Sequence, residues 1–402
     1  MKYDNEVVLN DINNSNDAYN DFYASVSVLF RITSFVFFIA FLFFIVHSAF
    51  LGQDAVTYDN LEYLVRNFSL TLEEKRNDNV YSIRYNPDSS RSYSLVGDKF
   101  TLSGNSGISI FSSTGRLTCS DAFSFKNPVM ETSDKYALIY DSGNCDILVY
   151  NSFTKVHSQT FDKPIRGASM SQNGFYALIT SSDEYTSTVE VYNDDFELIN
   201  RFNKSGYVVD VDMNNNSILI TSVEVSDNHS DYIVKTNLYD FNNNKTVCDA
   251  EFISSFPISC KISSSGFFIV CKNELINYNV DTKESNTFSF NGRVISDFEL
   301  TYDKAVLLLD DSGHDISYSL LSISDNSDIL YETQIGSTVY DVEVCGNSIC
   351  LLIEDCVLVL NSNGKKEIQL DVSVTGSRLL AYNDHTLYLC TESSAPLIDI
   401  EE

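Results

Sequence analysis

The chain has 402 residues, of which 56 are acidic and 26 basic, so its formal net charge is −30. This excess argues strongly against nucleic acid as a partner, because phosphate binding needs clustered Lys and Arg, and it argues against docking on anionic lipid headgroups. Nine cysteines are too few for a disulfide scaffold, and an odd number cannot all pair within one chain.

Residues 1–25 are rich in Asn, Asp and Ser. A segment with so few apolar residues cannot bury enough surface to fold, so we expect a disordered polar tail. The next segment, residues 26–52, contains the apolar run Ile32–Leu51, which carries no acidic or basic side chain. At about 1.5 Å per residue this run reaches roughly 30 Å, the thickness of a bilayer's hydrocarbon layer. The sequence therefore predicts one transmembrane helix over residues 26–52, with the lipid bilayer as its partner.

We interpret the apolar run as an uncleaved anchor rather than a signal peptide. The preceding segment is about thirty residues long and has no basic n-region, and the run is longer than a usual h-region. Arg31 lies on the N-terminal flank of the run, whereas the first basic residue beyond its C-terminal end is Arg66. The positive-inside rule therefore favours a cytoplasmic N-terminus, with the rest of the chain on the extracytoplasmic side of the cell membrane.

Residues 57–76 have the pattern of a short amphipathic helix. Their apolar side chains recur at the spacing of one helical face, and most charged side chains lie off that face. We expect a juxtamembrane stalk helix packed against the body, and a helix that binds a partner is the alternative. The apolar positions are Leu61, Leu64, Val65, Phe68 and Leu72.

From about residue 80 to residue 402 the helical period is replaced by short apolar runs between clusters of Asn, Asp, Gly and Ser. This pattern is typical of many short antiparallel strands. The runs recur about every 40 residues, which is the length of one four-stranded propeller blade. The last unit, near Thr375–Ile400, lacks a fourth strand, which Val80–Tyr85 could supply to close the ring. The sequence predicts an all-β propeller of about eight blades, with seven as the alternative.

Three segments of the body carry a resemblance to a known family. They are GNSGISIFSSTGRL (104–117), KYALIYDSGNCDILVYN (135–151) and PIRGASMSQNGFYALITSSDEYTSTVEVYN (164–193). They resemble an uncharacterised family of bacterial proteins with a domain of unknown function, in which one membrane anchor precedes a propeller-like body. The chain departs from that family at Cys119, where relatives tend to carry Trp. The resemblance implies a body outside the cytoplasmic membrane and brings no catalytic residues and no cofactor.

The sequence contains no recognisable catalytic or metal-binding motif. None of the five histidines has the partner of a His-Glu-x-x-His motif, and neither a G-x-S-x-G elbow nor a phosphate-binding loop occurs. Two acidic loops, Asp141–Asp146 and Asp310–Asp315, have the oxygen ligands that calcium uses, but they also have the residues that a tight hairpin turn needs. We therefore expect no metal and no cofactor.

Acidic residues recur at alternate positions on the segments predicted as innermost strands. Side chains at alternate positions of a strand share a face, so each pair points the same way and could line a central channel. A solvated channel wall is the simpler interpretation. One pair of cysteines, Cys345 and Cys350, would face each other across a hairpin turn at Asn347–Ser348, either as a disulfide or as two buried thiols. The acidic residues are Asp210, Asp212, Asp297, Glu299, Asp341 and Glu343.

These features favour a membrane-anchored, non-enzymatic module that binds a protein partner or senses a ligand in the cell envelope. The loops at one end of the ring would bind the partner, because they vary without touching the core. The alternative is an enzyme or cofactor binder of the quinoprotein, lactonase or lyase type that uses the acidic channel. Only analogy with other propellers favours the alternative.

Overall fold

The computed structural model describes residues 26–39, 41, 82–86, 91–226, 231–241, 243–311, 317–354, 356–372 and 376–400. The chain divides into two compact units, Met1–Arg76 and Asn77–Glu402. In the first unit, residues 26–39 and residue 41 are helical. Within the described part of the chain, no helix combines the length and the apolar character needed to cross a membrane. The predicted tail, the predicted juxtamembrane helix over residues 57–76 and the rest of the predicted transmembrane segment lie outside the described residues.

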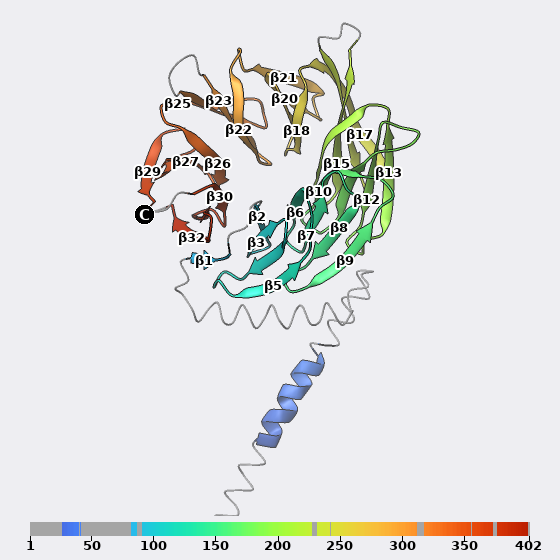
Figure 1. The fold of residues 1–402 in the computed structure, drawn as a ribbon, viewed down its shortest axis with the longest axis vertical. Helices are drawn as coiled ribbons and strands as arrows, with labels where there is room; N and C mark the ends of the chain where they lie inside the picture. Colours follow the sequence, from blue (N-terminus) through green and yellow to red (C-terminus); the bar gives the residue numbers. More distant parts are fainter. Residues whose placement is uncertain are drawn as a thin grey trace, which may run out of the picture. The chain divides into compact units, whose positions relative to one another are not determined.

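The second unit is a β-propeller of eight four-stranded antiparallel sheets, drawn as a ring in Figure 1. The predicted fold and blade number are confirmed, and the seven-bladed alternative is wrong. In blades 1 to 7 the four strands follow one another in sequence from the innermost strand to the outermost. Each hairpin is therefore local, as the regular spacing of turn residues predicts.

Blades 1 to 4 run from residue 91 to residue 254. Blade 1 has β2 (Arg91–Val96), β3 (Lys99–Gly104), β4 (Gly107–Phe111) and β5 (Leu117–Ala122); blade 2 has β6 (Pro128–Thr132), β7 (Ala137–Asp141), β8 (Asp146–Tyr150) and β9 (Lys155–Thr160); blade 3 has β10 (Ile165–Met170), β11 (Tyr176–Thr180), β12 (Ser187–Tyr192) and β13 (Leu198–Lys204); blade 4 has β14 (Tyr207–Met213), β15 (Ser217–Val225), β16 (Tyr232–Asp240) and β17 (Lys245–Ser254).

Blades 5 to 8 complete the ring. Blade 5 has β18 (Pro257–Ile262), β19 (Gly266–Cys271), β20 (Glu274–Asn279) and β21 (Glu284–Ser289); blade 6 has β22 (Val294–Leu300), β23 (Lys304–Asp310), β24 (Tyr318–Ser324) and β25 (Ile329–Ile335); blade 7 has β26 (Val339–Cys345), β27 (Ser348–Ile353), β28 (Cys356–Leu360) and β29 (Lys366–Asp371); blade 8 has β30 (Arg378–Ala381), β31 (Thr386–Cys390), β32 (Ser394–Asp399) and β1 (Ser82–Arg84).

The N-terminal strand β1 closes the ring, as the sequence predicts. It is the outermost strand of blade 8 and pairs antiparallel with β32, so that Ile83 lies opposite Ala395. Ile83 is 1% exposed and packs in the cluster between blades 8 and 1. The two ends of the propeller thus meet in one sheet, and closure depends on only three residues of β1.

The burial of each strand follows its position in the blade. Every residue of the second strands β7, β11 and β19 is buried. The outermost strand of blade 3, β13, alternates between exposed and partly buried side chains. Neighbouring blades cover both faces of the middle strands, so those strands are continuously apolar, whereas an outermost strand meets water. Eight hydrophobic clusters each span two adjacent blades, so the core is a ring of inter-blade contacts.

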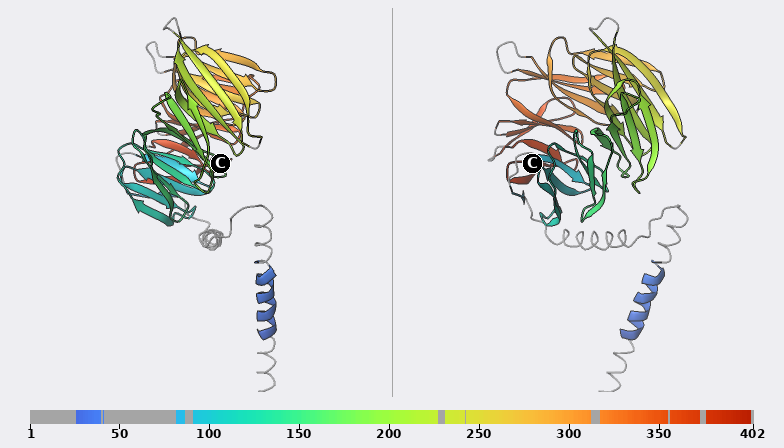
Figure 2. Two further views of the ribbon diagram at one scale, coloured as in Figure 1. Left: turned by 90° about the vertical axis from the view of Figure 1, so that its right-hand side faces the viewer. Right: turned by 45° about the vertical axis from the view of Figure 1, so that its right-hand side comes forward.

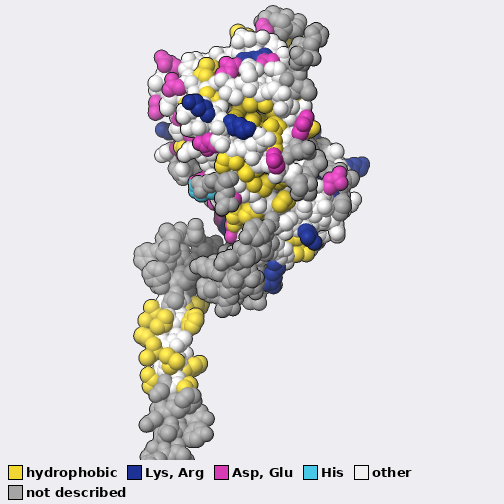
Figure 3. Space-filling model, turned by 90° about the vertical axis from the view of Figure 1, so that its left-hand side faces the viewer, with side chains coloured by type: hydrophobic (Ala, Val, Ile, Leu, Met, Phe, Trp, Pro, Cys, Tyr) yellow, Lys and Arg dark blue, Asp and Glu magenta, His cyan; other side chains and the backbone are white. Residues whose placement is uncertain are grey.

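The topology gives the ring two different faces. We call the face with the connections between blades and between second and third strands the loop face, and the opposite one, with the other hairpin turns, the turn face. Blade 4 has the longest strands, of nine and ten residues, coloured yellow-green in Figure 2. On the side of the ring shown in Figure 3, acidic and basic side chains are interspersed with apolar ones.

Candidate functional site

The innermost strands share a break in their pairing with the second strand. In five consecutive blades one residue bulges out, and the residue after the bulge begins a new register. In three of these blades that residue is an aspartate. The residues after the bulge are Gly167, Asp210, Ser259, Asp297 and Asp341.

Asp210 links blade 4 to blade 5 through both oxygens of its carboxylate. Oδ1 accepts a hydrogen bond from the backbone N–H of Val211 at 2.9 Å. Oδ2 accepts from the backbone N–H of Cys260 at 2.9 Å and from the hydroxyl of Ser259 at 2.8 Å. The first contact holds the side chain against its own strand, and the second reaches the innermost strand of the next blade.

The same contact recurs at the next two aspartates that follow a bulge. Asp297 Oδ2 accepts from the backbone N–H of Val342 at 3.0 Å, and Asp341 Oδ2 accepts from the backbone N–H of Leu379 at 2.6 Å. These bonds link blade 6 to blade 7 and blade 7 to blade 8. One carboxylate position therefore serves three inter-blade junctions.

The acids two residues further along reinforce two of these junctions. Asp212 accepts from the backbone N–H of Ile262 at 2.9 Å and from Nζ of Lys261 at 3.0 Å. Glu343 Oε1 accepts from the backbone N–H of Ala381 at 3.0 Å. In each of these pairs both carboxylates reach the same neighbouring strand, as their alternate spacing predicts.

The reason for this arrangement is that an innermost strand has no neighbour on its inner edge. Backbone N–H groups there need an acceptor, because a polar group left unpaired away from water costs about 1–3 kcal/mol. Carboxylates from the preceding blade provide that acceptor, and a hydrogen bond to a charged oxygen is stronger than one between neutral groups. The recurring acids are therefore structural links between blades.

Glu299 differs from the other five acids, because its carboxylate accepts no hydrogen bond from any described residue. Its interactions are electrostatic: Lys261 and Arg378 attract it, and Asp297 and Asp341 repel it. Lys261 and Arg378 lie on innermost strands β18 and β30, and the sequence analysis did not single them out. It also missed Glu131 on β6, which interacts with Asp210, Asp212 and Lys261. Each of these charged residues is isolated in the sequence, so no sequence pattern predicts that they interact. They come close together only when the blades assemble into the ring.

Burial raises the pKa values of several of these acids towards 7. It raises the pKa of Glu131 to about 8, with repulsion from Asp210 adding to the effect and attraction by Lys261 opposing it. Burial likewise raises the pKa of Glu299 to about 7 and that of Asp341 to about 6. For Glu343, burial and then repulsion by Glu299 raise the pKa to about 8. The cluster therefore binds protons in the physiological pH range.

The first of the two acidic loops considered for calcium, Asp141–Asp146, uses its leading carboxylate within the turn. Asp141 Oδ1 accepts from the backbone N–H groups of Lys126 and Asn127 at 3.1 and 2.7 Å, and Oδ2 accepts from Asn144 at 2.7 Å. Its oxygens thus serve the turn, and most of the second loop, from residue 312 to 316, lies outside the described residues. No group of three or more His, Cys, Asp or Glu in the described ranges is arranged to hold a metal ion.

The prediction that Cys345 and Cys350 face each other across the hairpin is wrong, because the strands pair in another register. The turn lies at Gly346–Asn347, so Cys345 is opposite Ser348 and Cys350 is opposite Glu343. Gly346 has a φ of +57°, a left-handed conformation that glycine adopts without strain. This conformation favours a turn that includes Gly346 over the predicted turn at Asn347–Ser348. None of the nine cysteines lies in a disulfide, and Cys345 and Cys350 are both buried.

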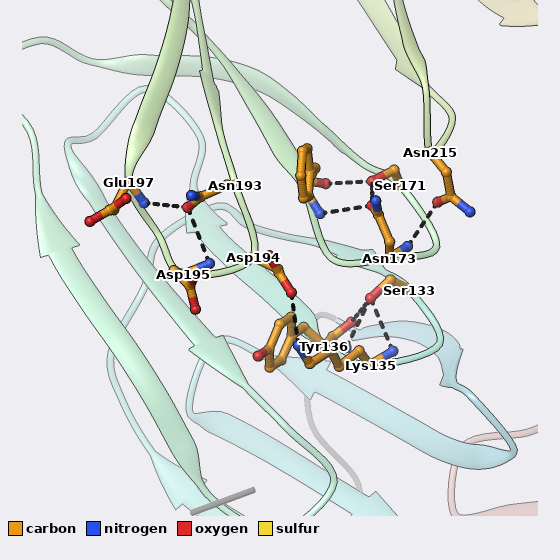
Figure 4. A network of polar contacts seen from close by, with 11 residues as sticks. Ser133, Lys135, Tyr136, Ser171, Asn173, Asn193, Asp194, Asp195, Glu197 and Asn215 are labelled. Carbon is orange, nitrogen blue, oxygen red and sulfur yellow. Dashed lines mark hydrogen bonds and ion pairs between the residues drawn. The ribbon is translucent and has the colours of Figure 1, made fainter. Parts of the chain in front are cut away.

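A second network of polar side chains, on the turn face, also serves the backbone (Figure 4). Asn193 Oδ1 accepts from the backbone N–H groups of Asp195 and Glu197 at 3.1 and 2.8 Å, as an Asx turn does. Lys135 Nζ donates to Asp194 Oδ2 at 3.0 Å, which connects the turns of blades 2 and 3. The clusters of Asn, Asp and Ser that punctuate the sequence are therefore turn residues.

Comparison with solved structures supports the propeller fold and nothing finer. BamB from Moraxella catarrhalis is similar with a TM-score of 0.54 and 10% sequence identity, over 80% of this chain and 98% of that chain. The computationally designed Ika8 protein is similar with a TM-score of 0.61 and 10% identity, over 79% of this chain and 99% of that chain. No curated protein matches the sequence.

A family model does match, over residues 73–400, which is nearly the whole propeller together with the residues just before it. That family is described only as one of unknown function, in agreement with the resemblance seen in the three sequence segments. The chain belongs to the family of unknown function DUF5711.

Proposed function

We propose that the protein is a non-enzymatic interaction module of the cell envelope, which binds a protein partner through the loop face of its propeller. The observation that carries this proposal is a set of exposed, large apolar side chains at the loop-face ends of strands in blades 4 to 7. We call this set the loop-face patch. Its members are Tyr207, Val225, Ile253, Phe256, Ile258, Val294 and Tyr340, which are between 37% and 76% exposed.

The loop-face patch is built on rigid elements. Phe256 lies in the connection between blades 4 and 5, and its carbonyl accepts a hydrogen bond from the N–H of Lys272 at 2.9 Å. The ring of Tyr232 contacts Phe256 edge-on, with centroids 5.4 Å apart. Val225 lies directly opposite Tyr232 in the sheet. Aromatic side chains held in place in this way serve as anchors of protein interfaces, because little conformational entropy is lost when they are covered.

The position of these residues distinguishes them from other exposed apolar side chains. On the turn face such residues lie mainly on outermost strands, as Leu198 does on β13 and Leu330 does on β25. Those strands stand apart at the periphery of the ring. Four members of the loop-face patch, by contrast, lie on the innermost strands of four consecutive blades, and the other three lie on β15, on β17 and in the connection between blades 4 and 5. Large apolar side chains that are exposed on one face of several blades mark a candidate interaction site, whereas single exposed apolar residues are ordinary.

The non-enzymatic part of the proposal rests on how the channel acids are used. Five of the six predicted acids accept backbone hydrogen bonds from the next blade. A carboxylate committed to the backbone is a poor general base, because proton transfer would break the junction that it forms.

We place the propeller outside the cytoplasmic membrane, with the N-terminus in the cytoplasm and the run Ile32–Leu51 as the anchor. The charge asymmetry around that run supports this orientation. The described helix over residues 26–39 overlaps the start of that run and carries apolar side chains such as Phe35, Phe37 and Phe38, which are 62%, 70% and 57% exposed. A protease added to intact cells should degrade a C-terminal tag on the full-length chain. Protection of the tag until the cells are lysed would contradict this orientation.

Paired serine substitutions in cells that produce the protein test the interaction itself. After chemical crosslinking, the full-length chain should retain a defined protein partner, and Phe256→Ser with Ile258→Ser should reduce its recovery at least fivefold. Ile329→Ser with Leu330→Ser removes two apolar side chains that are even more exposed, from the turn-face end of β25, and serves as the control. Equal loss of the partner in both double variants would refute the assignment of the loop face.

The second candidate is a propeller-scaffold enzyme or cofactor binder of the quinoprotein, lactonase or lyase type. The observation that favours it is Glu299, whose pKa burial raises to about 7 beside Lys261 and Arg378. A titrating carboxylate near neutral pH with cations beside it is what general acid–base catalysis requires. Lactone hydrolysis or lyase activity that is abolished by Glu299→Gln, without loss of stability, would favour this candidate over the first.

A further inference from the structure

A cleft of about 550 Å³ opens between blades 2 and 3, next to the loop face and apart from the acidic cluster. One wall consists of the end of β9 and the loop after it, residues 159–163. The other consists of the loop between β11 and β12, together with the adjoining parts of β12 and β13. A cleft of this size is within the range of small-molecule binding sites.

The rim of the cleft carries one ion pair between its two walls and a hydrogen-bonded turn within one of them. Lys163, from blade 2, forms an ion pair with Asp183, from blade 3. In the loop of blade 3, the hydroxyl of Ser182 accepts hydrogen bonds from the backbone N–H groups of Glu184 and Tyr185, both at 3.3 Å. This turn holds Tyr185 at the rim with 43% of its surface exposed. The cleft therefore carries an exposed aromatic ring at its rim.

The floor of the cleft combines hydroxyl, amide and aromatic groups. Thr188 Oγ1 donates to Asn203 Oδ1 at 3.0 Å. Glu190 accepts from the hydroxyl of Tyr192 at 2.9 Å and from Nη2 of Arg201 at 2.5 Å. The ring of Phe161 meets Tyr192 edge-on at 6.0 Å. Such a surface presents donors and acceptors in several directions next to apolar ring surface.

Charge in the cleft is largely neutralised by internal pairs. Glu190 is paired with Arg201, and Asp183 is paired with Lys163. The two other acids at the cleft, Asp162 and Glu184, are exposed and solvated. Neither an anion nor a cation therefore finds an uncompensated buried charge to bind, which favours a neutral polar ligand.

Tyr176 lies beneath Tyr192, on the side away from the cleft, and supports its ring. The two rings stack with their centroids 4.9 Å apart, and Tyr176 is fully buried. Its hydroxyl has no hydrogen-bond partner among the described residues. Tyr176 does not itself line the cleft, so its part is to hold the ring of Tyr192 in the cleft wall.

We infer that this cleft binds a neutral oligosaccharide. Tyr185 offers a ring face for the apolar face of a sugar, and the side chains of Asn203, Thr188 and the Glu190–Arg201 pair offer hydrogen bonds to its hydroxyls. The inference goes beyond the proposed protein interaction and does not depend on it, because none of these residues belongs to the loop-face patch.

Calorimetric titration of the full-length chain, in a buffer free of glycosides, tests the inference. The probes are chitotriose, maltotriose and cellotriose, with trigalacturonate and trilysine as charged counterparts. At least one neutral trisaccharide should bind saturably, and Tyr185→Ala should weaken its affinity about tenfold by removing the stacking contact. Tyr185→Phe, which keeps the ring, should bind within about twofold of the wild type.

Tyr302→Ala is the matched control, because Tyr302 is also an exposed tyrosine, 62% against 43% for Tyr185, and lies in the turn between β22 and β23 on the opposite face. It should leave sugar affinity unchanged. Three results would each overturn the inference: no neutral trisaccharide binds at millimolar concentration, Tyr185→Ala and Tyr302→Ala have equal effects, or a charged probe binds more tightly than every neutral one. Tyr185 is exposed, so its replacement should leave the fold intact, and a urea denaturation curve verifies this.

Discussion

Replacing Glu131 by Gln is expected to flatten the dependence of stability on pH. Glu131 lies on the innermost strand β6, and its carboxylate accepts no hydrogen bond from any described residue. Burial, with repulsion from Asp210, raises its pKa from 4.5 to about 8. Gln has nearly the same shape and no charge, so the substitution removes the titration and leaves the packing in place.

The sign follows from proton binding in the two states. Between pH 4.5 and 8 the folded chain holds the Glu131 proton and the unfolded chain has lost it, so the free energy of unfolding falls as pH rises through this window. From pH 5 to 8 the upper limit is about 4 kcal/mol, at about 1.4 kcal/mol per unit, and screening by channel water reduces it to about 2 kcal/mol. Glu131→Gln should thus match the wild type near pH 5 and be about 2 kcal/mol more stable at pH 8.

Urea denaturation of the full-length chain at pH 5 and pH 8, followed by circular dichroism, measures this difference. Glu367→Gln, on the exposed face of the outermost strand β29, is the control and should change stability at neither pH. If Glu131→Gln loses as much stability between pH 5 and pH 8 as the wild type does, then Glu131 is not the group whose proton release destabilises the fold in this range.

Further predictions concern the junctions between blades, the closure of the ring and the thiols. Asp341→Ala leaves the N–H of Leu379 without its acceptor and should lower the unfolding free energy by about 1–3 kcal/mol in urea titrations, whereas Asp341→Asn keeps an acceptor oxygen and should cost less. Ile83→Ala removes a side chain that is 1% exposed from the closing strand and should cost about 2–5 kcal/mol by the same measurement. Gly266→Ala would place a Cβ 2.0 Å from the carbonyl oxygen of Tyr278, so we expect a loss of about 1–3 kcal/mol or more, seen as a lower urea midpoint, while Gly292→Ala, with open space around its Cβ, should show only the smaller cost of a positive φ. Ellman titration of the chain unfolded without reductant should count nine thiols. A count of seven would show that two cysteines form a disulfide.

The strand pattern was predictable because burial in a propeller depends on position within the blade. Middle strands such as β7 and β11 are covered on both faces, so their residues form an uninterrupted apolar run that can be read without a structure. The closing role of residues near Ile83 followed from the same count, because the last unit had three strands and needed a fourth. The eightfold ring therefore follows from local patterns and the spacing of turns.

The chemistry of the channel could be predicted only in part. Alternate spacing correctly gives Asp341 and Glu343 a common face, but it does not reveal that both accept N–H groups from blade 8. That outcome depends on the bulge before Asp341 and on the unpaired inner edge of β30, which are properties of the assembled ring. The pKa shift of Glu131 could not be predicted from the sequence either, because the charged residues that interact with it, Asp210, Asp212 and Lys261, belong to blades 4 and 5.

The most direct test of the proposed interaction is a photo-crosslinking amino acid placed at Ile258, in the loop-face patch, in cells that produce the full-length protein. Irradiation should yield one discrete crosslinked protein, and the same probe at Leu330, on the turn-face end of β25, should not yield it. Phe256→Ser in the Ile258 background should reduce the yield. The same adduct at both positions, or no adduct at Ile258 in envelopes from intact cells, would contradict the proposal that the loop face binds a protein partner.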